Sequence, residues 1–198
     1  MDQQTIAAYD TKAVQIAAIH RAVTPTRTLA LVAQFFHAGD SIADVGCGSG
    51  RDTAWLAAGG YPVVGYDASM GMLAQARAAY PELEFVQAAL PELRGVPAAA
   101  SMNVLCNAVL MHLPAAALAP ALCRLGELLS PGGRLLVTFR PSTAAGEREA
   151  DGRLFSAISP DDFAALAADA GLALVHRETR ADDERPAVTW HTVVAERP

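Results

Sequence analysis

The sequence predicts an α/β fold in which a mostly parallel sheet of seven strands carries helices on both faces, in a Rossmann-like, doubly wound arrangement. Between residues 41 and 139, short apolar segments alternate with segments of helical periodicity. The last two apolar segments have no helix between them. Parallel neighbours need crossover connections, so the alternation indicates a parallel sheet, and the final pair predicts an antiparallel hairpin at its C-terminal edge.

Composition favours one soluble domain whose partners are small molecules or proteins rather than nucleic acid. The chain has 198 residues, is 52% hydrophobic and carries a net charge of −6. This is enough apolar material for one core, and the acidic balance argues against a nucleic-acid surface. No stretch of the sequence is apolar enough to span a bilayer. We therefore expect a cytoplasmic protein with a small-molecule acceptor, no nucleic acid and no membrane partner, as a monomer or a homodimer.

The cysteines indicate neither a disulfide framework nor a metal site. Cys47, Cys106 and Cys123 are odd in number, widely spaced and without histidines at metal-ligand intervals. We expect reduced thiols in or near the core, and we expect Cys47 and Cys106 to act as small apolar groups rather than nucleophiles.

The elements are expected in a definite order. The first forty residues are predicted to be helical, because apolar residues recur at roughly helical spacing: Ile6, Ala13, Ile16, Ile19 and Val23. Thr24 and Pro25 predict the cap and first turn of a second helix. The predicted strands are 41–45, 62–66, 83–87, 102–106, 134–139, 172–179 and 189–196.

Capping residues mark the helices between these strands. One helix is expected at 52–58, and Ser69, Pro114 and Ser159 are each expected to begin another. Residues 130–133 predict a turn into the fifth strand. We divide the single domain, 1–198, into four parts: a helical lid at 1–40, a cofactor-binding core at 41–139, a substrate-side loop at 140–158, and a helix with the terminal hairpin at 159–198.

A glycine turn after the first strand is the main functional feature. Gly46, Gly48 and Gly50 lie where a strand ends and a helix opens, so backbone N–H groups can approach a ligand closely. In open sheets of this kind, ligands bind beyond the carboxyl ends of the strands. The dinucleotide fingerprint needs its third glycine one place later, where this chain has Arg51.

Charged residues around the turn suggest the groups of a cofactor. Asp67 closes the second strand, where a carboxylate can accept hydrogen bonds from both hydroxyls of a ribose. Asp44 could bind an ammonium group, and Arg51 could pair with a carboxylate. A cofactor that carries a ribose, an amine and a carboxylate satisfies all three.

Three motifs in order resemble the class I S-adenosylmethionine-dependent methyltransferases, in their small-molecule, type 11-like branch. They are DVGCGSG at 44–50, GYDAS at 65–69 and LSPGG at 129–133. The resemblance covers residues 41–139, and the terminal hairpin is similar to that family's antiparallel last strand. It implies S-adenosyl-L-methionine as cofactor and S-adenosyl-L-homocysteine as product.

The resemblance also implies roles for individual residues. The turn, with Gly46, Cys47, Gly48, Ser49 and Gly50, would lie against the methionine half of the cofactor, and Asp67 would take the ribose hydroxyls. Flanking the adenine would be Ala68, Ser69 and Met70. Ala88, Ala89 and Leu90 stand where the family often has an acidic residue for the adenine amino group, so that contact is lost or made by backbone. Asn107, Ala108 and Val109 would pass beneath the cofactor, and Tyr9 resembles an N-terminal aromatic that folds over the site.

The implied reaction is an in-line displacement that depends on proximity and exclusion of water, because a sulfonium already supplies an activated methyl group. His112 is the candidate catalytic base for a neutral acceptor. The alternative is that His112 caps a loop or packs against the ligand. We interpret Arg140, Arg148, Arg153 and His176 as solvated charges around a loop rather than as an anion site.

Other functions stay open from the sequence. A non-catalytic S-adenosylmethionine-binding sensor or partner module, or a methyltransferase acting on a protein, would use the same fold. A nicotinamide oxidoreductase is disfavoured by Arg51. The Asn/Asp-Pro-Pro-aromatic motif of nucleic-acid amino-methyltransferases is not found after the fourth strand, where the chain reads NAVL at 107–110.

Overall fold

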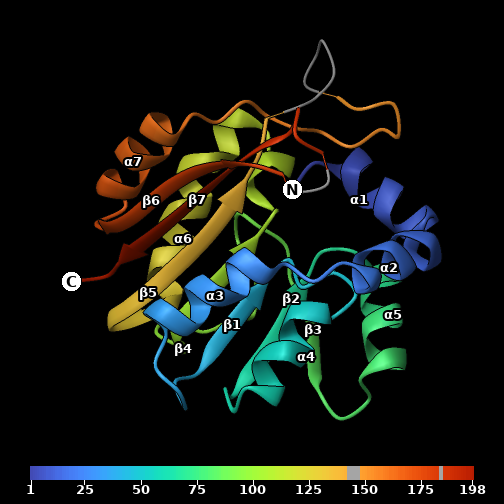
Figure 1. Cartoon of the computed structure of the whole chain (residues 1–198), viewed down its shortest axis with the longest axis horizontal. Helices are drawn as coiled ribbons and strands as arrows, with labels where there is room; N and C mark the ends of the chain where they lie inside the picture. Colours follow the sequence, from blue (N-terminus) through green and yellow to red (C-terminus); the bar gives the residue numbers. More distant parts are fainter. Residues whose placement is uncertain (142–147, 183–184) are drawn as a thin grey trace.

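A computed structural model describes residues 1–141, 148–182 and 185–198. Seven strands form one sheet in the order β3-β2-β1-β4-β5-β7-β6 (Figure 1). The strands are β1 (Ile42–Val45), β2 (Val63–Asp67), β3 (Glu84–Gln87), β4 (Ser101–Asn107), β5 (Leu129–Phe139), β6 (Ala173–Ala181) and β7 (Thr189–Glu196). Neighbours from β3 to β5 are parallel, whereas β7 is antiparallel to both β5 and β6. The predicted sheet and its antiparallel C-terminal pair are confirmed.

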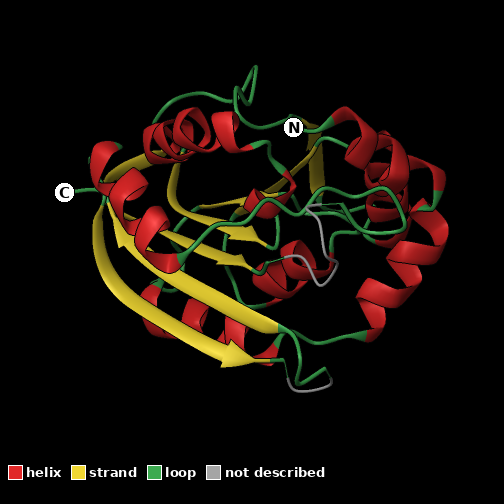
Figure 2. Ribbon diagram, turned by 90° about the horizontal axis from the view of Figure 1, so that it is seen from above, coloured by secondary structure: helices red, strands yellow, loops and turns green. Residues whose placement is uncertain are grey.

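Helices lie on both sides of the sheet (Figure 2). They are α1 (Gln3–Thr11), α2 (Ala13–Ala22), α3 (Thr26–Phe35), α4 (Arg51–Ala58), α5 (Met70–Ala79), α6 (Leu118–Leu128) and α7 (Pro160–Asp169), with 3₁₀ turns η1 (Leu110–His112) and η2 (Ala115–Ala117). In the part of the chain that the structure describes, none of these helices combines the length and apolarity needed to cross a membrane.

Alternate residues of the strands build two apolar layers, as the pleat of a strand requires. On one face, Ile42 and Leu105 pack with Leu31 of α3 and Leu56 of α4. On the other face, the cluster includes strand residues such as Val104 together with residues of α6 and α7. The sheet is therefore covered on both faces, and its carboxyl-terminal edge is left for loops.

The N-terminal helices divide between two places. Helices α1 and α2 lie beside α5 (Figure 1), and Ala13 and Ala17 of α2 form an apolar cluster with Met72 of α5. Helix α3 packs on the sheet instead and belongs to the core. The role of residues 1–40 as a lid stays a prediction. Residues 142–147 of the expected substrate-side loop lie outside the described residues.

Local capping follows the sequence closely at two helices. The Ser69 hydroxyl accepts a hydrogen bond from the Met72 N–H at 3.0 Å. At α7, the Ser159 hydroxyl accepts from the Asp162 N–H, and the Asp162 carboxylate accepts from the Ser159 backbone in a complete capping box. Both predicted helix starts are confirmed.

Three local expectations are wrong. The cap of α3 is Pro25, which makes no side-chain capping bond, so Thr24 is not the cap. Strand β5 begins at Leu129 rather than at Arg134. The residues of the expected turn, 130–133, lie inside this strand, at an irregularity in its pairing with β4: Ser101 pairs with Leu129, and the next pair is Asn103 with Arg134. Cys123 is exposed on α6, whereas Cys47 and Cys106 are buried.

Candidate active site

The glycine turn connects β1 to α4 at the carboxyl edge of the sheet. The N–H groups of Gly46 and Cys47 both donate to the Tyr66 carbonyl, at 2.7 and 3.0 Å. Gly46 has a φ of +80°, and a Cβ atom there would lie 2.2 Å from Cγ2 of Val109. Only glycine combines this left-handed backbone with so close a neighbour. The turn is therefore packed directly beneath Val109.

Asp67 is fixed by the backbone on both of its carboxylate oxygens. Oδ2 accepts a hydrogen bond from the Gly48 N–H and Oδ1 accepts one from the Ser69 N–H, each at 2.8 Å. Burial raises the pKa of Asp67, whereas these N–H bonds lower it. Each oxygen can accept a further hydrogen bond, so the carboxylate can bind two hydroxyls side by side.

A cavity of about 790 Å³ lies over this edge. The turn, Asp67 and residues of α1 and α2 line it. Ser49 also lines it, and its hydroxyl is buried without a hydrogen-bond partner among the described residues. A buried polar atom without a partner costs free energy, so the Ser49 hydroxyl is a candidate contact for a polar ligand group.

A hydrogen-bonded chain of side chains crosses the floor of the cavity. The Asp52 carboxylate accepts from the Asn107 amide Nδ2 at 2.7 Å and from the Arg51 guanidinium. The Asn107 amide oxygen in turn accepts from the Thr138 hydroxyl, whose oxygen accepts from the Ala108 N–H. These bonds join the ends of β4 and β5 to the start of α4.

Comparison with known proteins relates this arrangement to methyltransferases. Residues 42–133 match the family model of a methyltransferase domain. The chain is 42% identical over 100 residues to trans-aconitate 2-methyltransferase of Methylobacterium nodulans, a match that covers 48% of this chain and 36% of that protein. Trans-aconitate 2-methyltransferase of an Azoarcus species is 42% identical over 102 residues, which cover 49% of this chain and 38% of that protein. Residues 42–133 of the chain are therefore similar to a methyltransferase domain.

Solved structures agree with this fold. The chain is similar to the 1,6-didemethyltoxoflavin-N1-methyltransferase of Burkholderia thailandensis, with a TM-score of 0.75, 22% identity, and coverage of 96% of this chain and 88% of that one. An S-adenosylmethionine-dependent methyltransferase of Mesorhizobium loti has a TM-score of 0.72 at 22% identity, with coverage of 87% and 96%. The match to curated relatives is shorter, since the chain spans little more than a third of their length.

Most of the expected site residues line the cavity: Tyr9, Gly46, Cys47, Gly48, Ser49, Arg51, Asp67, Ala68, Ser69, Ala88, Leu90, Asn107, Ala108, Val109 and His112. Four do not: Asp44, Gly50, Met70 and Ala89. Gly50 instead allows a close approach of Phe85, whose ring would lie 2.7 Å from a Cβ atom at this position.

Asp44 is placed differently from the expectation. It is 1% exposed, and its carboxylate accepts a hydrogen bond from the Thr53 hydroxyl at 2.6 Å. Burial, together with the nearby charge of Asp52, raises the pKa of Asp44 to about 7. The pleat of β1 directs this side chain toward α4 rather than into the cavity. Asp52, which we did not predict, provides a carboxylate in the cavity wall in place of Asp44.

Arg51 joins the turn to the N-terminal helices. Its guanidinium donates to the Asp52 carboxylate and to the carbonyls of His20 and Val23, the last two at 3.1 Å each. Contact between Arg51 and a cofactor carboxylate stays a prediction. Met70 is 49% exposed at the start of α5, and Met72 lines the cavity two positions later.

His112 and Tyr9 meet in the cavity. Nδ1 of His112 lies 2.6 Å from the Leu154 carbonyl, which can only accept, so Nδ1 carries the proton of the neutral ring. The Tyr9 hydroxyl lies 3.1 Å from Nε2 and therefore donates to it. Burial lowers the pKa of His112 to about 4, even though the bond to Leu154 raises it. His112 is neutral near pH 7, and its lone pair is engaged.

We expect His112 to make folding sensitive to acid. Its pKa is about 4 when folded and 6.5 in the reference state, so the unfolded chain binds more protons between these values. The free energy of unfolding should fall as the pH is lowered from 6.5 to 4. Relative to His112→Gln, the wild type should lose about 3 kcal/mol over this range. Urea unfolding at several pH values measures this. Parallel pH curves for the two proteins would contradict the assignment, because every other group titrates in both.

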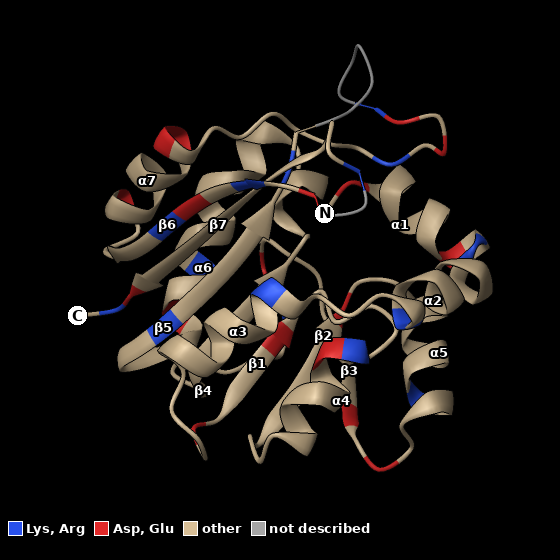
Figure 3. Cartoon of the chain, in the orientation of Figure 1, with Lys and Arg blue, Asp and Glu red and all other residues tan. Residues whose placement is uncertain are grey.

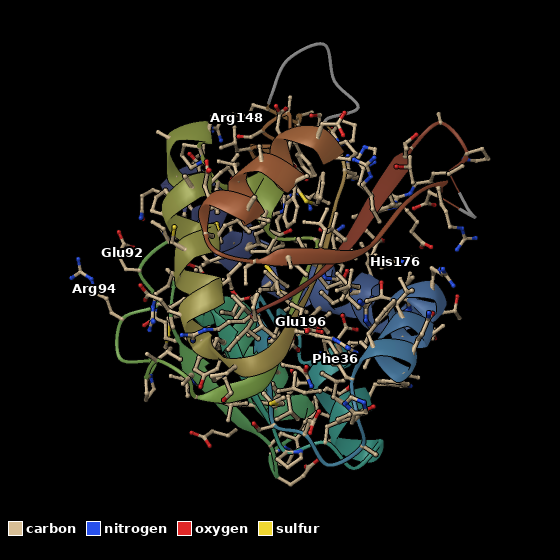
Figure 4. The ribbon with its side chains drawn as sticks, turned by 90° about the vertical axis from the view of Figure 1, so that its left-hand side faces the viewer. Phe36, Glu92, Arg94, Arg148, His176 and Glu196 are labelled. Carbon is tan, nitrogen blue, oxygen red and sulfur yellow. The ribbon has the colours of Figure 1, made fainter. Side chains whose placement is uncertain are left out.

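Arg140 and Arg153 are not the solvated charges that we expected. Arg140 is 8% exposed, and both line the cavity. Arg148 is exposed and pairs with Asp2, so the interpretation suits it. His176 lies in a separate part of the molecule (Figure 4), where its ring packs beside Phe35 of α3 and its Nε2 is buried, so it is not a solvated charge either.

The residues that sequence reasoning missed lie at the same edge of the sheet: Asp52, Met72, Thr138, Arg140, Arg153 and Phe155. Thr138 and Arg140 carried a signal, since they are polar residues at the carboxyl end of a strand. Arg153 and Phe155 carried none, because they come from an irregular segment. Among residues 1–141, 148–182 and 185–198, no cluster of His, Cys, Asp or Glu could hold a metal ion.

Proposed function

We propose that this chain transfers a methyl group from S-adenosylmethionine to a small molecule bound in the cavity. The observation that carries the proposal is Asp67, whose two oxygens are held by backbone N–H groups beside the glycine turn. This geometry suits a ribose with two free hydroxyls. The match of residues 42–133 to a methyltransferase domain supports the reaction, and the names of the curated relatives, which refer to trans-aconitate, support a small acceptor.

The residues present fit such a cofactor. Asp67 would hold the ribose, and the buried Ser49 hydroxyl offers a hydrogen bond to the methionine portion. Asp52, rather than Asp44, offers a carboxylate to the ammonium group. Met72, rather than Met70, offers an apolar surface for the adenine.

S-adenosylmethionine supplies, when bound, a methyl group on a positively charged sulfur. The chain's own residues then have to align the acceptor and keep water out. Tyr9, Met111 and Phe155 line the acceptor side of the cavity with apolar surface. Because His112 is neutral and its Nε2 accepts from Tyr9, we assign it to orientation of Tyr9 rather than to proton removal.

Calorimetry tests the cofactor directly. We expect S-adenosylmethionine and S-adenosylhomocysteine to bind one site per chain, and NAD not to bind, because Arg51 replaces the third glycine of the dinucleotide fingerprint. A chain that binds NAD but neither sulfur compound would overturn the proposal. Turnover with a labelled methyl donor across small acids, alcohols and amines then separates an enzyme from a sensor.

The remaining expectations belong to the same proposal. A cytoplasmic protein with no nucleic-acid partner is consistent with the net charge of −6. A protein substrate would leave small molecules unmodified and label a peptide library in the same assay. Sedimentation would distinguish a monomer from a homodimer.

A further inference from the structure

Two arginines lie against one aromatic ring in the wall of the cavity. The guanidinium carbon of Arg140 is 4.1 Å from the ring centroid of Phe155, and that of Arg153 is 5.4 Å from the same centroid. Trp190 and Tyr9 add a further ring to each, at 6.0 and 5.5 Å. Stacking holds a guanidinium by its face and leaves its edge available for hydrogen bonds.

Both arginines are also oriented by acidic neighbours. Arg153 donates to the Asp151 carboxylate at 2.8 Å and to the Tyr9 hydroxyl at 3.2 Å. Arg140 donates to the Pro141 carbonyl at 3.0 Å and lies 3.6 Å from the Glu149 carboxylate. A guanidinium has five N–H donors, so neither set of contacts uses all of them. Among the described residues, the acidic partners therefore hold the two side chains in place and leave some N–H donors of each guanidinium available for a ligand.

The charge of the cavity wall is opposite to that of the whole protein. Among the described residues that line the cavity, seven are Lys or Arg and five are Asp or Glu, an excess of two positive charges. The whole chain carries −6. Along the segment that leads from the grey trace toward α7, Figure 3 shows acidic positions flanked by basic ones. A positive wall in an acidic protein favours an anionic ligand.

Resting on the proposed function, we propose that Arg140 and Arg153 hold a carboxylate of the methyl acceptor. The acceptor is a small organic acid with at least two carboxylates, and a second carboxylate takes the methyl group. Arginine binds the planar carboxylate through paired N–H bonds. Such bonds would reduce the reactivity of the oxygen that attacks, so the carboxylate on the arginines is the one that does not react.

The surroundings of His112 fit an acceptor that has no proton to lose. Nε2 of His112 accepts from Tyr9, and Nδ1 donates to Leu154, so neither ring nitrogen is open to a substrate hydroxyl. A carboxylate is already ionised near pH 7. Its oxygen forms a bond to the methyl carbon with its own electron pair while the sulfur–carbon bond breaks and its pair stays on sulfur. The products are a methyl ester and a neutral thioether, and no proton moves.

Burial of the reacting groups favours this step. A negative oxygen and a positive sulfur become neutral together, so charge disappears as the transition state is reached. A cavity with little water stabilises the separated charges less than bulk water does. Phe155, Met111 and Trp190 provide such an environment in the wall.

Calorimetry with propane-1,2,3-tricarboxylate tests the subsite, with its trimethyl ester as the neutral control. The titration is run with and without saturating S-adenosylhomocysteine, so it gives a result whether or not the cofactor binds. We expect the tricarboxylate to bind and the ester not to bind. Arg140→Gln and Arg153→Gln should each raise the Kd for the tricarboxylate roughly 10-fold or more, with the Kd for S-adenosylhomocysteine changed by less than about 3-fold.

Arg124→Gln is the matched control. Arg124 is also largely buried and donates to the carbonyls of Glu92 and Val96, but it does not line the cavity. It should leave tricarboxylate binding unchanged. Thermal unfolding confirms that each variant is folded, and Arg140→Lys, which keeps the charge, should recover part of the affinity.

The chemical identity of the product gives a second, independent result. With a labelled methyl donor and a panel of di- and tricarboxylates, we expect a product that releases volatile methanol in base, as a methyl ester does. Equal binding of the tricarboxylate and its ester, unchanged affinity in both Gln variants, or a base-stable product on a neutral acceptor would each overturn the inference. Failure of S-adenosylhomocysteine to bind would instead overturn the proposed function.

Discussion

Replacing Gly46 with alanine is expected to destabilise the protein and remove cofactor binding together. The backbone at Gly46 has a φ of +80°, which a residue with a Cβ atom adopts at a cost of about 1 to 2 kcal/mol. The new Cβ would also lie 2.2 Å from Cγ2 of Val109, so Val109 must move. We expect the two effects to lower the free energy of unfolding by roughly 2 to 4 kcal/mol. Urea unfolding measures the loss.

Two further variants separate the causes. Gly39→Ala has a similar φ of +85° but no heavy atom within 4 Å of its Cβ, so it should cost about 1 kcal/mol, the backbone part alone. Adding Val109→Ala to Gly46→Ala should recover part of the larger loss, because it removes the methyl groups that clash. Equal effects of Gly39→Ala and Gly46→Ala would show that the contact with Val109 does not matter.

The importance of this turn was predictable from sequence because its cause is local. Glycines at Gly46, Gly48 and Gly50 follow an apolar strand, and all three have positive φ. The cap at Ser69 is equally local, since the donor is the N–H three residues later. Parallel order in the sheet followed from the helices between strands, and the antiparallel pair from the missing helix. Features decided within a few residues could be predicted.

The prediction that Asp44 faces the ligand, where the structure has Asp52, shows a limit of reasoning from sequence. Asp44 is next to the glycines in sequence, but the strand pleat turns its side chain toward Thr53 of α4. Asp52 is in the first turn of that helix and reaches the cavity wall, where Asn107 donates to it. Sequence distance to a motif is a poor guide when neighbouring side chains of a strand point to opposite faces.

The pairing of Arg140 with Arg153 could not be predicted from the sequence. Arg140 directly follows β5, whereas Arg153 lies thirteen positions later in irregular backbone, and both guanidinium groups lie against the ring of Phe155. As separate charges in a polar segment they look solvated. Their burial depends on aromatic side chains from α1 and β7, namely Tyr9 and Trp190, which no local pattern places near them.

Replacing Asp67 with asparagine is expected to weaken S-adenosylhomocysteine binding roughly 10- to 100-fold. A hydrogen bond to a charged group contributes about 1.5 to 3 kcal/mol, and each 1.4 kcal/mol is a factor of ten in Kd. The variant also loses one of the two bonds from Gly48 and Ser69, because an amide nitrogen cannot accept from an N–H. Calorimetry measures the affinity. Asp162→Asn is the matched control, since Asp162 also accepts from a backbone N–H, that of Ser159, and does not line the cavity.

A modified ligand distinguishes ribose binding from damage to the turn. The wild type should bind the 2′-deoxy analogue of S-adenosylhomocysteine more weakly than the parent compound, because one hydroxyl bond to Asp67 is lost. In Asp67→Asn, whose bond to that hydroxyl is already weakened, removing the hydroxyl should have much less effect. The coupling between the two changes isolates the ribose contact from any change in the backbone at Gly48. Equal losses from the deoxy ligand in both proteins would mean that Asp67 shapes the loop and does not bind the ribose.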